Sequence, residues 1–355
     1  MGGKAFGHHN PPLATPRMSS DLYYSLRDQY VGLLSQLFQY VASPMPGPGK
    51  TSHGDIDILV TAFHNESTTK VASFGSETLH NPAKEAIVDL LNPVGILHES
   101  ETLNLALPHP ELPNSYIQLD VHIVPTVRQW HWLLFTHSYG DAFNLICTSL
   151  HKLGLAGTDK GLFARDAEIE IHDGKKSRIF LTDDPTSVLT FLHLNPSDWL
   201  PAPNSQTYSP KQPFSSSTDL FHAISRMRYF STNHFSRLRP SDRHRLGKRE
   251  LYTTFMDTFL PAMLATMSTS ESELRTSSTS MPKNPTFSRE QVFHEALTYW
   301  NKEDEWRRIK MAWEYDRIAL LSRRLIREEK KSAMATEDRY FDAWLAWSGF
   351  ETGDY

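Results

Sequence analysis

Residues 50–60 read KTSHGDIDILV, in which two carboxylates alternate with branched apolar side chains directly after a glycine. Alternation with a period of two predicts a β-strand, and successive side chains of a strand point to opposite faces. Asp55 and Asp57 are therefore expected on one face, with Ile56 on the other. Two like charges this close persist because a cation lies between them or because water screens them. The stretch predicts either a cation site or a strand with one solvated acidic face.

A second run with strand alternation, residues 116–124, carries a third carboxylate, Asp120, in an apolar setting. Another strand is predicted over residues 101–107. Asn81-Pro82-Ala83 supplies the capping residue and the first-turn proline that begin a helix. Together these elements predict a small α/β unit.

Upstream of the acidic strand, the Ser-Ser-Asp sequence at residues 19–21 offers N-cap chemistry for a helix. Apolar residues then recur at steps of three and four, which predicts an amphipathic helix to about Tyr40. Ala42-Ser43 follows the end of this helix, and a loop rich in proline and glycine occupies residues 44–49. The expected order is therefore a helix, a short turn with a serine, and the acidic strand.

This order resembles the nucleotidyltransferase superfamily typified by DNA polymerase beta. The family's signature is a Gly-Ser pair, a short spacer, an acidic pair in a strand and a third acid on a later strand, and the likeness covers roughly the first 125 residues. Residues 1–6, MGGKAF, are also similar to the start of uncharacterised nucleotidyltransferase-like proteins of fungi and large DNA viruses; a mobile terminus is the alternative interpretation. The resemblance implies an α/β (α+β) fold, with a small mixed-sheet palm that places Asp120 beside the Asp55/Asp57 strand and a mostly helical C-terminal region after it.

The resemblance also implies the chemistry. Asp55, Asp57 and Asp120 would bind Mg²⁺ (or Mn²⁺) and move a nucleoside monophosphate from an NTP such as ATP to an acceptor hydroxyl, with release of pyrophosphate. The acceptor would be a nucleic-acid end, a protein or a small molecule. His122 shares the face of Asp120 and is expected either to support the ligands or to be an ordinary satisfied histidine. The residues assigned to the nucleotide are Ser43, Lys50, Ser52, Gly54, Tyr139 and Lys152.

Some of these residues have a second interpretation. Tyr139 could be a packed core residue, and Lys152 could be a solvated helix end. Ala42 stands where the family has glycine, which motivates a different function: a catalytically degenerate nucleotidyltransferase-fold protein that acts as an RNA- or protein-binding scaffold. Clustered arginines among aromatics can bind the phosphates and stack on the bases of RNA or DNA, and a solvated basic helix face is the alternative. The basic residues concerned are Arg226, Arg228, Arg243, Arg245, Lys248 and Arg249.

The composition is that of a globular protein. The chain has 355 residues, of which 39% are hydrophobic, and this is enough for two domains with a sizeable core. A net charge of −5 argues against a uniformly basic nucleic-acid wrapper. The single cysteine, Cys147, cannot form an intramolecular disulfide, which favours a reducing compartment. With no apolar run of membrane length and no secretory signal pattern, the expected location is cytoplasmic or nuclear.

Further along the chain, a long helix is expected from Ser288 to about Lys331, with Trp313, Leu320 and Leu321 on its buried side. Three short strands are expected at Gly161–Arg165, Glu168–His172 and Arg178–Leu181, and a helix is expected to begin at Asp184-Pro185. The expected segments are an N-terminal arm (1–18), a nucleotidyltransferase-like α/β domain (19–195), a basic helical region (196–265), a flexible linker (266–287) and a C-terminal helical region (288–355).

Overall fold

The computed structural model describes residues 3–64, 81–99, 101–200, 213–235, 243–244, 246–266 and 287–348. The chain divides into two compact units. One consists of residues 1–164 and 180–300, and the other of residues 165–179 and 301–355. The expected boundary at residue 288 therefore lies inside the first unit.

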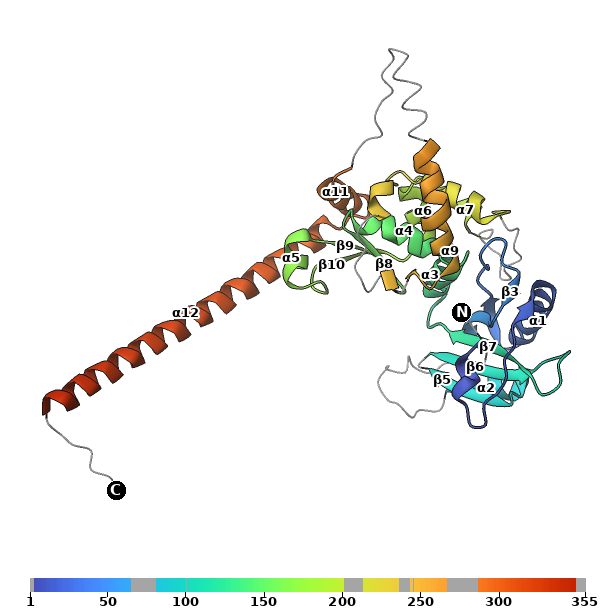
Figure 1. The fold of residues 1–355 in the computed structure, drawn as a ribbon, viewed down its shortest axis with the longest axis horizontal. Coiled ribbons are helices and arrows are strands. Elements are labelled where there is room, and N and C mark those ends of the chain that lie inside the picture. The colour runs from blue at the N-terminus through green and yellow to red at the C-terminus, as the bar shows by residue number, and fades with distance from the viewer. Residues whose placement is uncertain are drawn as a thin grey trace, which may run out of the picture. The chain divides into compact units, whose positions relative to one another are not determined.

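The first unit is built on a five-stranded mixed sheet with the strand order β2-β4-β7-β6-β5 (Figure 1). β4 and β7 run parallel, and the other neighbouring pairs are antiparallel. The strands expected around Asp57, over residues 101–107 and over residues 116–124 are confirmed, whereas β2 and β5 were not predicted. The bounds are β2 (Phe38–Ala42), β4 (Ile56–Phe63), β5 (Gly95–Glu99), β6 (Thr102–Pro108) and β7 (Tyr116–Ile123).

Helix α1 (Ser20–Leu34) begins where the capping residues predicted, since the Ser19 side chain accepts a hydrogen bond from the backbone N–H of Leu22. The prediction that this helix continues to about Tyr40 is wrong. The chain turns after Leu34 and forms β2, which pairs with β4. Aromatic and β-branched residues favour a strand here, and pairing with β4 outweighs an apolar spacing that also suits a helix.

Both α1 and α2 (Pro82–Leu91) pack on one face of the sheet, and α2 has the expected Asn81 cap and first-turn proline. Alternate residues of the central strands, such as Ile58 of β4 and Val121 of β7, form the core on this side. These side chains are fully buried because the helices exclude water from the whole face. The polar residues of the same strands therefore point to the opposite face.

The opposite face is covered only at its two sides. On one side, Leu59 packs against Trp130 of α3 (Val127–His137), whose indole Nε1 donates to the Leu59 carbonyl at 2.9 Å. On the other side, Ala106 packs against Phe6 and Leu13 of the N-terminal arm. Polar side chains occupy the strip between these two apolar clusters.

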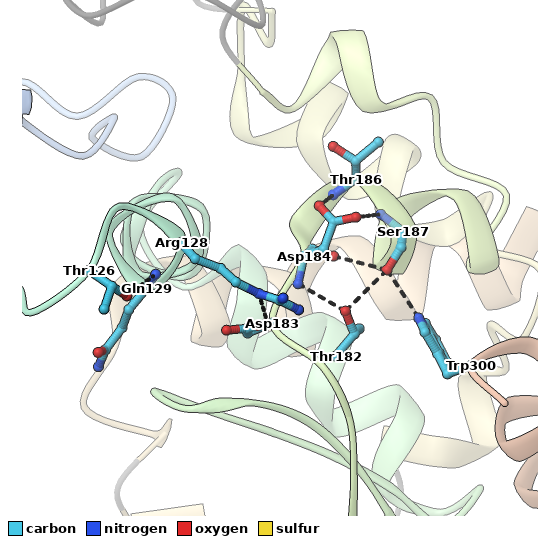
Figure 2. A network of polar contacts seen from close by, with 9 residues as sticks. All are labelled: Thr126, Arg128, Gln129, Thr182, Asp183, Asp184, Thr186, Ser187 and Trp300. Atoms are coloured by element: carbon cyan, nitrogen blue, oxygen red, sulfur yellow. Dashed lines mark hydrogen bonds and ion pairs between the residues drawn. The ribbon is translucent and has the colours of Figure 1, made fainter. Parts of the chain in front are cut away.

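A polar network joins α3, α6 (Pro185–Phe191) and the end of α11 (Arg289–Tyr299) within the first unit, as Figure 2 shows. Asp184 caps α6 by accepting from the N–H groups of Thr186 and Ser187 at 3.0 and 3.1 Å. The Ser187 hydroxyl accepts from the indole N–H of Trp300 at 3.1 Å, and Arg128 forms an ion pair with Asp183. The predicted start of a helix at Asp184-Pro185 is therefore confirmed.

The remaining elements are helices, a two-stranded sheet of β1 and β3, and a three-stranded sheet with the order β10-β9-β8. The strands expected at Gly161–Arg165 and Arg178–Leu181 are confirmed as β9 and β10. The bounds are η1 (Ala5–His8), β1 (Met18–Ser19), β3 (Ser52–His53), α4 (Ala142–His151), β8 (Leu155–Thr158), β9 (Gly161–Arg165), β10 (Arg178–Thr182), η2 (Pro196–Asp198), α7 (Ser217–Ser225), η3 (Thr232–Phe235), α9 (Glu250–Thr254) and the π-helical turn η4 (Phe255–Phe259).

The second unit contains α5 (Ala167–His172) and the 46-residue helix α12 (Glu303–Ser348) (Figure 1). A strand at Glu168–His172 was predicted and is wrong, because Asp166 accepts from the N–H groups of Glu168 and Ile169 and so begins a helix instead. The single helix expected from residue 288 to about residue 331 is also wrong. It is interrupted after α11, where Asn301 has a φ of 54°.

In α12, Trp313 is buried as expected, whereas Leu320 and Leu321 are 70% and 47% exposed, contrary to prediction. The expected linker at 266–287 lies almost entirely outside the described residues, as do the side chains of Trp344 and Trp347. None of the helices in the described ranges has the length and apolar character needed to cross a membrane.

Candidate active site

The polar strip of the five-stranded sheet contains the predicted carboxylates. Asp57 on β4 and Asp120 on β7 are register partners of two parallel strands, and Asn104 on β6 is the antiparallel partner of Asp120. Register partners share a face, so these three side chains form a row across the sheet. Asp55 lies two residues before Asp57, immediately ahead of β4. The structure thus brings together the three acids that the sequence placed far apart.

The electrostatics of this row are those of crowded like charges. Burial raises the pKa of Asp120 to about 7, and the Asp57 charge adds to this effect. Burial and the same Asp57 charge also raise the pKa of Asp55. Asp120 is only 8% exposed, so water does little to screen this repulsion. The neighbouring donors and cations therefore offset only part of the effect of burial and repulsion, and the pKa values of Asp55 and Asp120 stay raised.

Gln118 holds Asp120 in place. Its side-chain amide donates to both carboxylate oxygens of Asp120 at 3.0 Å, and its own Oε1 accepts from the backbone N–H of Ala5 at 3.1 Å. Gln118 is buried, so this chain of hydrogen bonds is sheltered from water. Beside it, the buried Asn104 carbonyl oxygen makes no hydrogen bond within the described structure. An acceptor is therefore free next to Asp120.

His122 supports Asp57. Its Nε2 lies 3.2 Å from Asp57 Oδ1, and its Nδ1 lies 2.9 Å from the hydroxyl of Thr102. Burial by itself lowers the pKa of His122, but the hydrogen bond to Asp57 and the Asp57 charge outweigh it, so the net pKa is raised. His122 therefore lies where it can orient the Asp57 carboxylate, which agrees with the first of its two interpretations. Thr102 was not foreseen.

The N-terminal arm also reaches the site, which the sequence interpretation missed. The backbone N–H of Gly3 hydrogen-bonds the Asp55 carboxylate. Gly3 has a φ of 81°, and a Cβ at this position would lie 2.3 Å from the carbonyl oxygen of Gly54. The Thr15 hydroxyl donates to the Gly3 carbonyl at 2.6 Å. Residues 3–6 are therefore a packed part of the site, and only glycine fits at residue 3.

The loop that precedes the acidic strand carries the residues expected to bind the triphosphate. Ser43 follows β2, and its buried hydroxyl makes no hydrogen bond of normal geometry within the described residues. Lys50 is exposed, and its charge acts to lower the pKa of Asp55. The Ser52 hydroxyl already accepts from Arg17 Nε at 2.6 Å, a contact that was not predicted. Of these three residues, Lys50 is the exposed one, whereas the Ser43 hydroxyl is buried beside Tyr23.

The proline-rich part of this loop is anchored. The Met45 N–H donates to the Ser138 hydroxyl at 3.1 Å, and the Met45 carbonyl accepts from the Tyr139 N–H at 2.6 Å. The Tyr139 side chain is buried against Trp199, whose carbonyl accepts its hydroxyl hydrogen at 3.3 Å. Lys152 is an exposed residue at the C-cap of α4. Tyr139 and Lys152 thus have the packing and helix-end positions that were the alternatives to nucleotide binding.

The basic residues are only partly available to a nucleic acid. Arg228 pairs with Glu295 and lies over the Tyr229 ring, and Arg249 pairs with Asp141. These two arginines stabilise the first unit internally. Arg226, Arg243 and Lys248 are exposed, while Arg245 lies outside the described residues.

A metal would find suitable ligands at the row of acids. In the described parts of the chain, no group of three or more His, Cys, Asp or Glu side chains is already gathered around one ion position. The donor chemistry nevertheless fits a hard divalent cation, because Mg²⁺ and Mn²⁺ prefer carboxylate oxygens. A bound cation would also offset the repulsion that raises the pKa of Asp120.

The comparisons with known proteins leave the family open. No family model matches the chain, and the search of curated proteins found no match. A functional assignment therefore depends on the arrangement of the side chains themselves.

Proposed function

We propose that the protein is a metal-dependent nucleotidyltransferase. The observation that carries this proposal is the pairing of Asp57 with Asp120 on adjacent parallel strands, with Asp55 two residues upstream and a raised pKa at both Asp55 and Asp120. Structural carboxylates are normally paired with cations or donors, and sites whose pKa values are strongly perturbed are enriched in function.

The order of elements around these acids supports a nucleotidyltransferase palm. A helix and a strand precede Ser43, the acid pair begins the next strand, and the third acid lies on a later strand that pairs with it in parallel. Ala42 occupies the glycine position of the family signature, but it is the last residue of β2 and is fully covered by Trp130 and its neighbours. Ser43 is the next residue, so the backbone passes from β2 into Ser43 without a glycine at position 42.

Asp55, Asp57 and Asp120 would hold Mg²⁺ or Mn²⁺, which when bound supplies charge for the triphosphate and lowers the pKa of a coordinated hydroxyl. Gln118 orients Asp120, and His122 orients Asp57. In the transfer, an acceptor oxygen forms a bond to the α-phosphorus while the bond from that phosphorus to the bridging oxygen breaks. The acceptor proton leaves to solvent, and pyrophosphate departs.

The triphosphate would lie at the loop. Ser43 offers a hydroxyl at the start of the loop, beside Tyr23, and Lys50 offers an exposed ammonium group whose charge lowers the pKa of Asp55. Donors and a cation at the β- and γ-phosphates stabilise the negative charge that develops on pyrophosphate as it leaves. The acceptor would be an RNA or DNA end, a protein side chain or a small hydroxyl compound.

The test combines binding and turnover. Binding of each of the four NTPs is measured by calorimetry with and without Mn²⁺, and pyrophosphate release is measured against a panel of RNA ends. We expect metal-dependent NTP binding that is lost in Asp55→Ala and Asp57→Ala and kept in Asp28→Ala, an exposed aspartate on α1. Circular dichroism checks that each variant is folded.

Two outcomes would overturn the proposal. Transfer that survives in both Asp55→Ala and Asp57→Ala would reject these ligands. Folded wild-type protein that binds neither Mn²⁺ nor NTP would favour the second candidate function, an inactive scaffold, which the alanine at residue 42 motivates. That scaffold would bind RNA in a salt-sensitive manner, and charge removal at the exposed Arg243 would weaken it.

A further inference from the structure

The second unit has an exposed apolar stripe on α12. Near its start, α12 packs on α5 through one side. The Trp306 indole donates to Asp166 at 2.9 Å, and Trp313 is 8% exposed. Ten large apolar side chains in the described part of α12 are between 47% and 75% exposed, and six of these lie on one side of the helix between residues 311 and 326. The six are Met311, Tyr315, Ile318, Leu321, Leu325 and Ile326.

These six residues lie on one side of the helix. Met311, Ile318 and Leu325 are separated by seven residues each, which returns them to nearly the same face. With about 100° per residue, Trp313 points roughly 200° away from Met311. The stripe therefore faces away from α5 and spans about four turns of helix. Glu314 and Ser322 also lie within this arc, so six of its eight positions between residues 311 and 326 are apolar. A mostly apolar, exposed helix face of this size is typical of an interface.

We propose that this stripe binds the same stripe of a second copy of the chain, with the two α12 helices antiparallel and a two-fold axis at Ile318. In this register Ile318 lies opposite its own copy. The axis places each residue opposite the residue that is equally far from Ile318 on the reversed helix. Met311 therefore lies opposite Leu325 of the other copy, and Tyr315 lies opposite Leu321. The stripe is thus complementary to itself when one helix is reversed.

The charges that flank the stripe select this arrangement. In the antiparallel register, Arg307 lies opposite Glu329 of the other copy, and Arg308 lies opposite Glu328. By helix periodicity Glu329 lies on the same line as Met311, in the middle of the stripe. A parallel dimer would therefore place Glu329 directly against its own copy, and like charges in an interface are unfavourable. The antiparallel dimer replaces that repulsion with ion pairs at both ends.

The area is sufficient for a specific dimer. Six side chains of this size and exposure, covered in each of two copies, remove on the order of 1,000 Å² from water in total, which is near the lower limit for specific interfaces. Tyr315 and the aliphatic residues at the centre would supply most of the affinity. The dimer does not involve the acid row in the first unit. The dimer proposal is therefore independent of the proposed enzymatic activity, and either one can be rejected without the other.

The first test is sedimentation of the full-length chain over a range of micromolar concentrations. We expect a reversible dimer, and Ile318→Lys is expected to raise its dissociation constant by roughly 100-fold or more, because it places two charges at the centre of the interface. Leu320→Lys is the matched control, since Leu320 is 70% exposed but lies off the stripe. A wild-type monomer at every concentration, or a dimer that Ile318→Lys leaves intact, would overturn the proposal.

Two further variants test the antiparallel register. Arg307→Glu should weaken the dimer by roughly tenfold, and adding Glu329→Arg in the same chain should restore it. In a Cys147→Ser background, an equal mixture of Met311→Cys and Leu325→Cys chains should form a disulfide-linked heterodimer. Disulfide dimers formed by Met311→Cys alone would instead show a parallel pair and reject the register.

Discussion

Two buried aspartates, Asp120 in the five-stranded sheet and Asp166 before α5, have pKa values shifted in opposite directions. Burial raises both values to begin with. At Asp166 the indole N–H of Trp306, two backbone N–H groups and the Lys310 ammonium outweigh burial and lower the pKa. At Asp120 burial, together with the charges of Asp57 and Asp55, outweighs the Gln118 hydrogen bond and the His122 charge and raises the pKa to about 7.

This difference separates a structural carboxylate from one that is available for function. Asp166 has its full set of donors, so its charge stabilises the contact between α5 and α12. Asp120 lies among like charges, and a bound cation would stabilise its charged form. The same side chain thus has a different role because different atoms surround it.

The largest expected difference between the two aspartates is in metal affinity. Asp120→Asn should weaken Mn²⁺ binding on the order of 1,000-fold, equivalent to about 4 kcal/mol, because it removes a ligand charge. Asp166→Asn should leave Mn²⁺ binding unchanged. Calorimetric titration of both variants at pH 8 measures this. Equal losses in the two variants would mean that the comparison reflects folding rather than ligation.

Although Asp120→Asn should weaken metal binding, it should make the metal-free chain more stable. The folded pKa of Asp120 is raised to about 7, so the folded state holds a proton that the unfolded state releases near pH 4. The free energy of unfolding should therefore fall as the pH rises from about 4 to about 7. Asp120→Asn should remove this slope and stabilise the metal-free chain by about 3 kcal/mol at pH 8.

Urea unfolding followed by circular dichroism, in the presence of a chelator, measures the slope. Saturating Mg²⁺ should stabilise wild type and not Asp120→Asn. A wild-type chain whose stability does not change between pH 5 and pH 8 would show that Asp120 is not held among uncompensated charges.

Asp166→Asn should destabilise the second unit. Its folded pKa is lowered, so its contribution is present above the unfolded pKa near 4 and is lost as the pH falls below that value. We expect a loss of about 2 kcal/mol at pH 7 and little effect near pH 3. Fluorescence of Trp306 and Trp313 during urea unfolding reports on this unit. Asp316→Asn, which removes an exposed ion pair with Lys176, is the control and should cost less than about 0.5 kcal/mol.

The smallest expected effect concerns the N-terminal arm. Gly3→Ala places a Cβ against the Gly54 backbone, so the arm must shift and its hydrogen bond to Asp55 must weaken. Mn²⁺ affinity should fall about tenfold, in the range typical for the loss of a group that orients a ligand. Gly7→Ala, at a position with open space around it, is the matched control. Equal affinities in both variants would show that the arm packs beside the acids without positioning them.

Local patterns were enough to predict several elements. The alternation around Asp57 and Asp120, and the caps at Ser19, Asn81 and Asp184, depend on neighbouring residues only, and the structure has the corresponding strands and helices. The failures fall where local patterns are ambiguous. Residues 38–42 carry apolar residues at a spacing that suits either a helix or a strand, and pairing with β4 decided between them.

Short segments and distant partners caused the other errors. Glu168–His172 alternates over too few residues to distinguish a strand from one and a half turns of helix, and the Asp166 cap selected the helix. The sequence around Thr102 gave no sign that its hydroxyl would meet His122, because the two residues are brought together only by the register of β6 and β7.

By itself, the sequence determined which residues could carry charge on one face of a strand, and it singled out Asp55, Asp57 and Asp120. A period of two is a property of the extended backbone, so it needs no knowledge of the rest of the chain. Only the tertiary structure decided that β4 and β7 pair in parallel with Asp57 opposite Asp120, and that Gly3 and Gln118 support the row. Pairing and burial depend on contacts between residues far apart in the chain, and those contacts set the pKa values on which the chemistry depends.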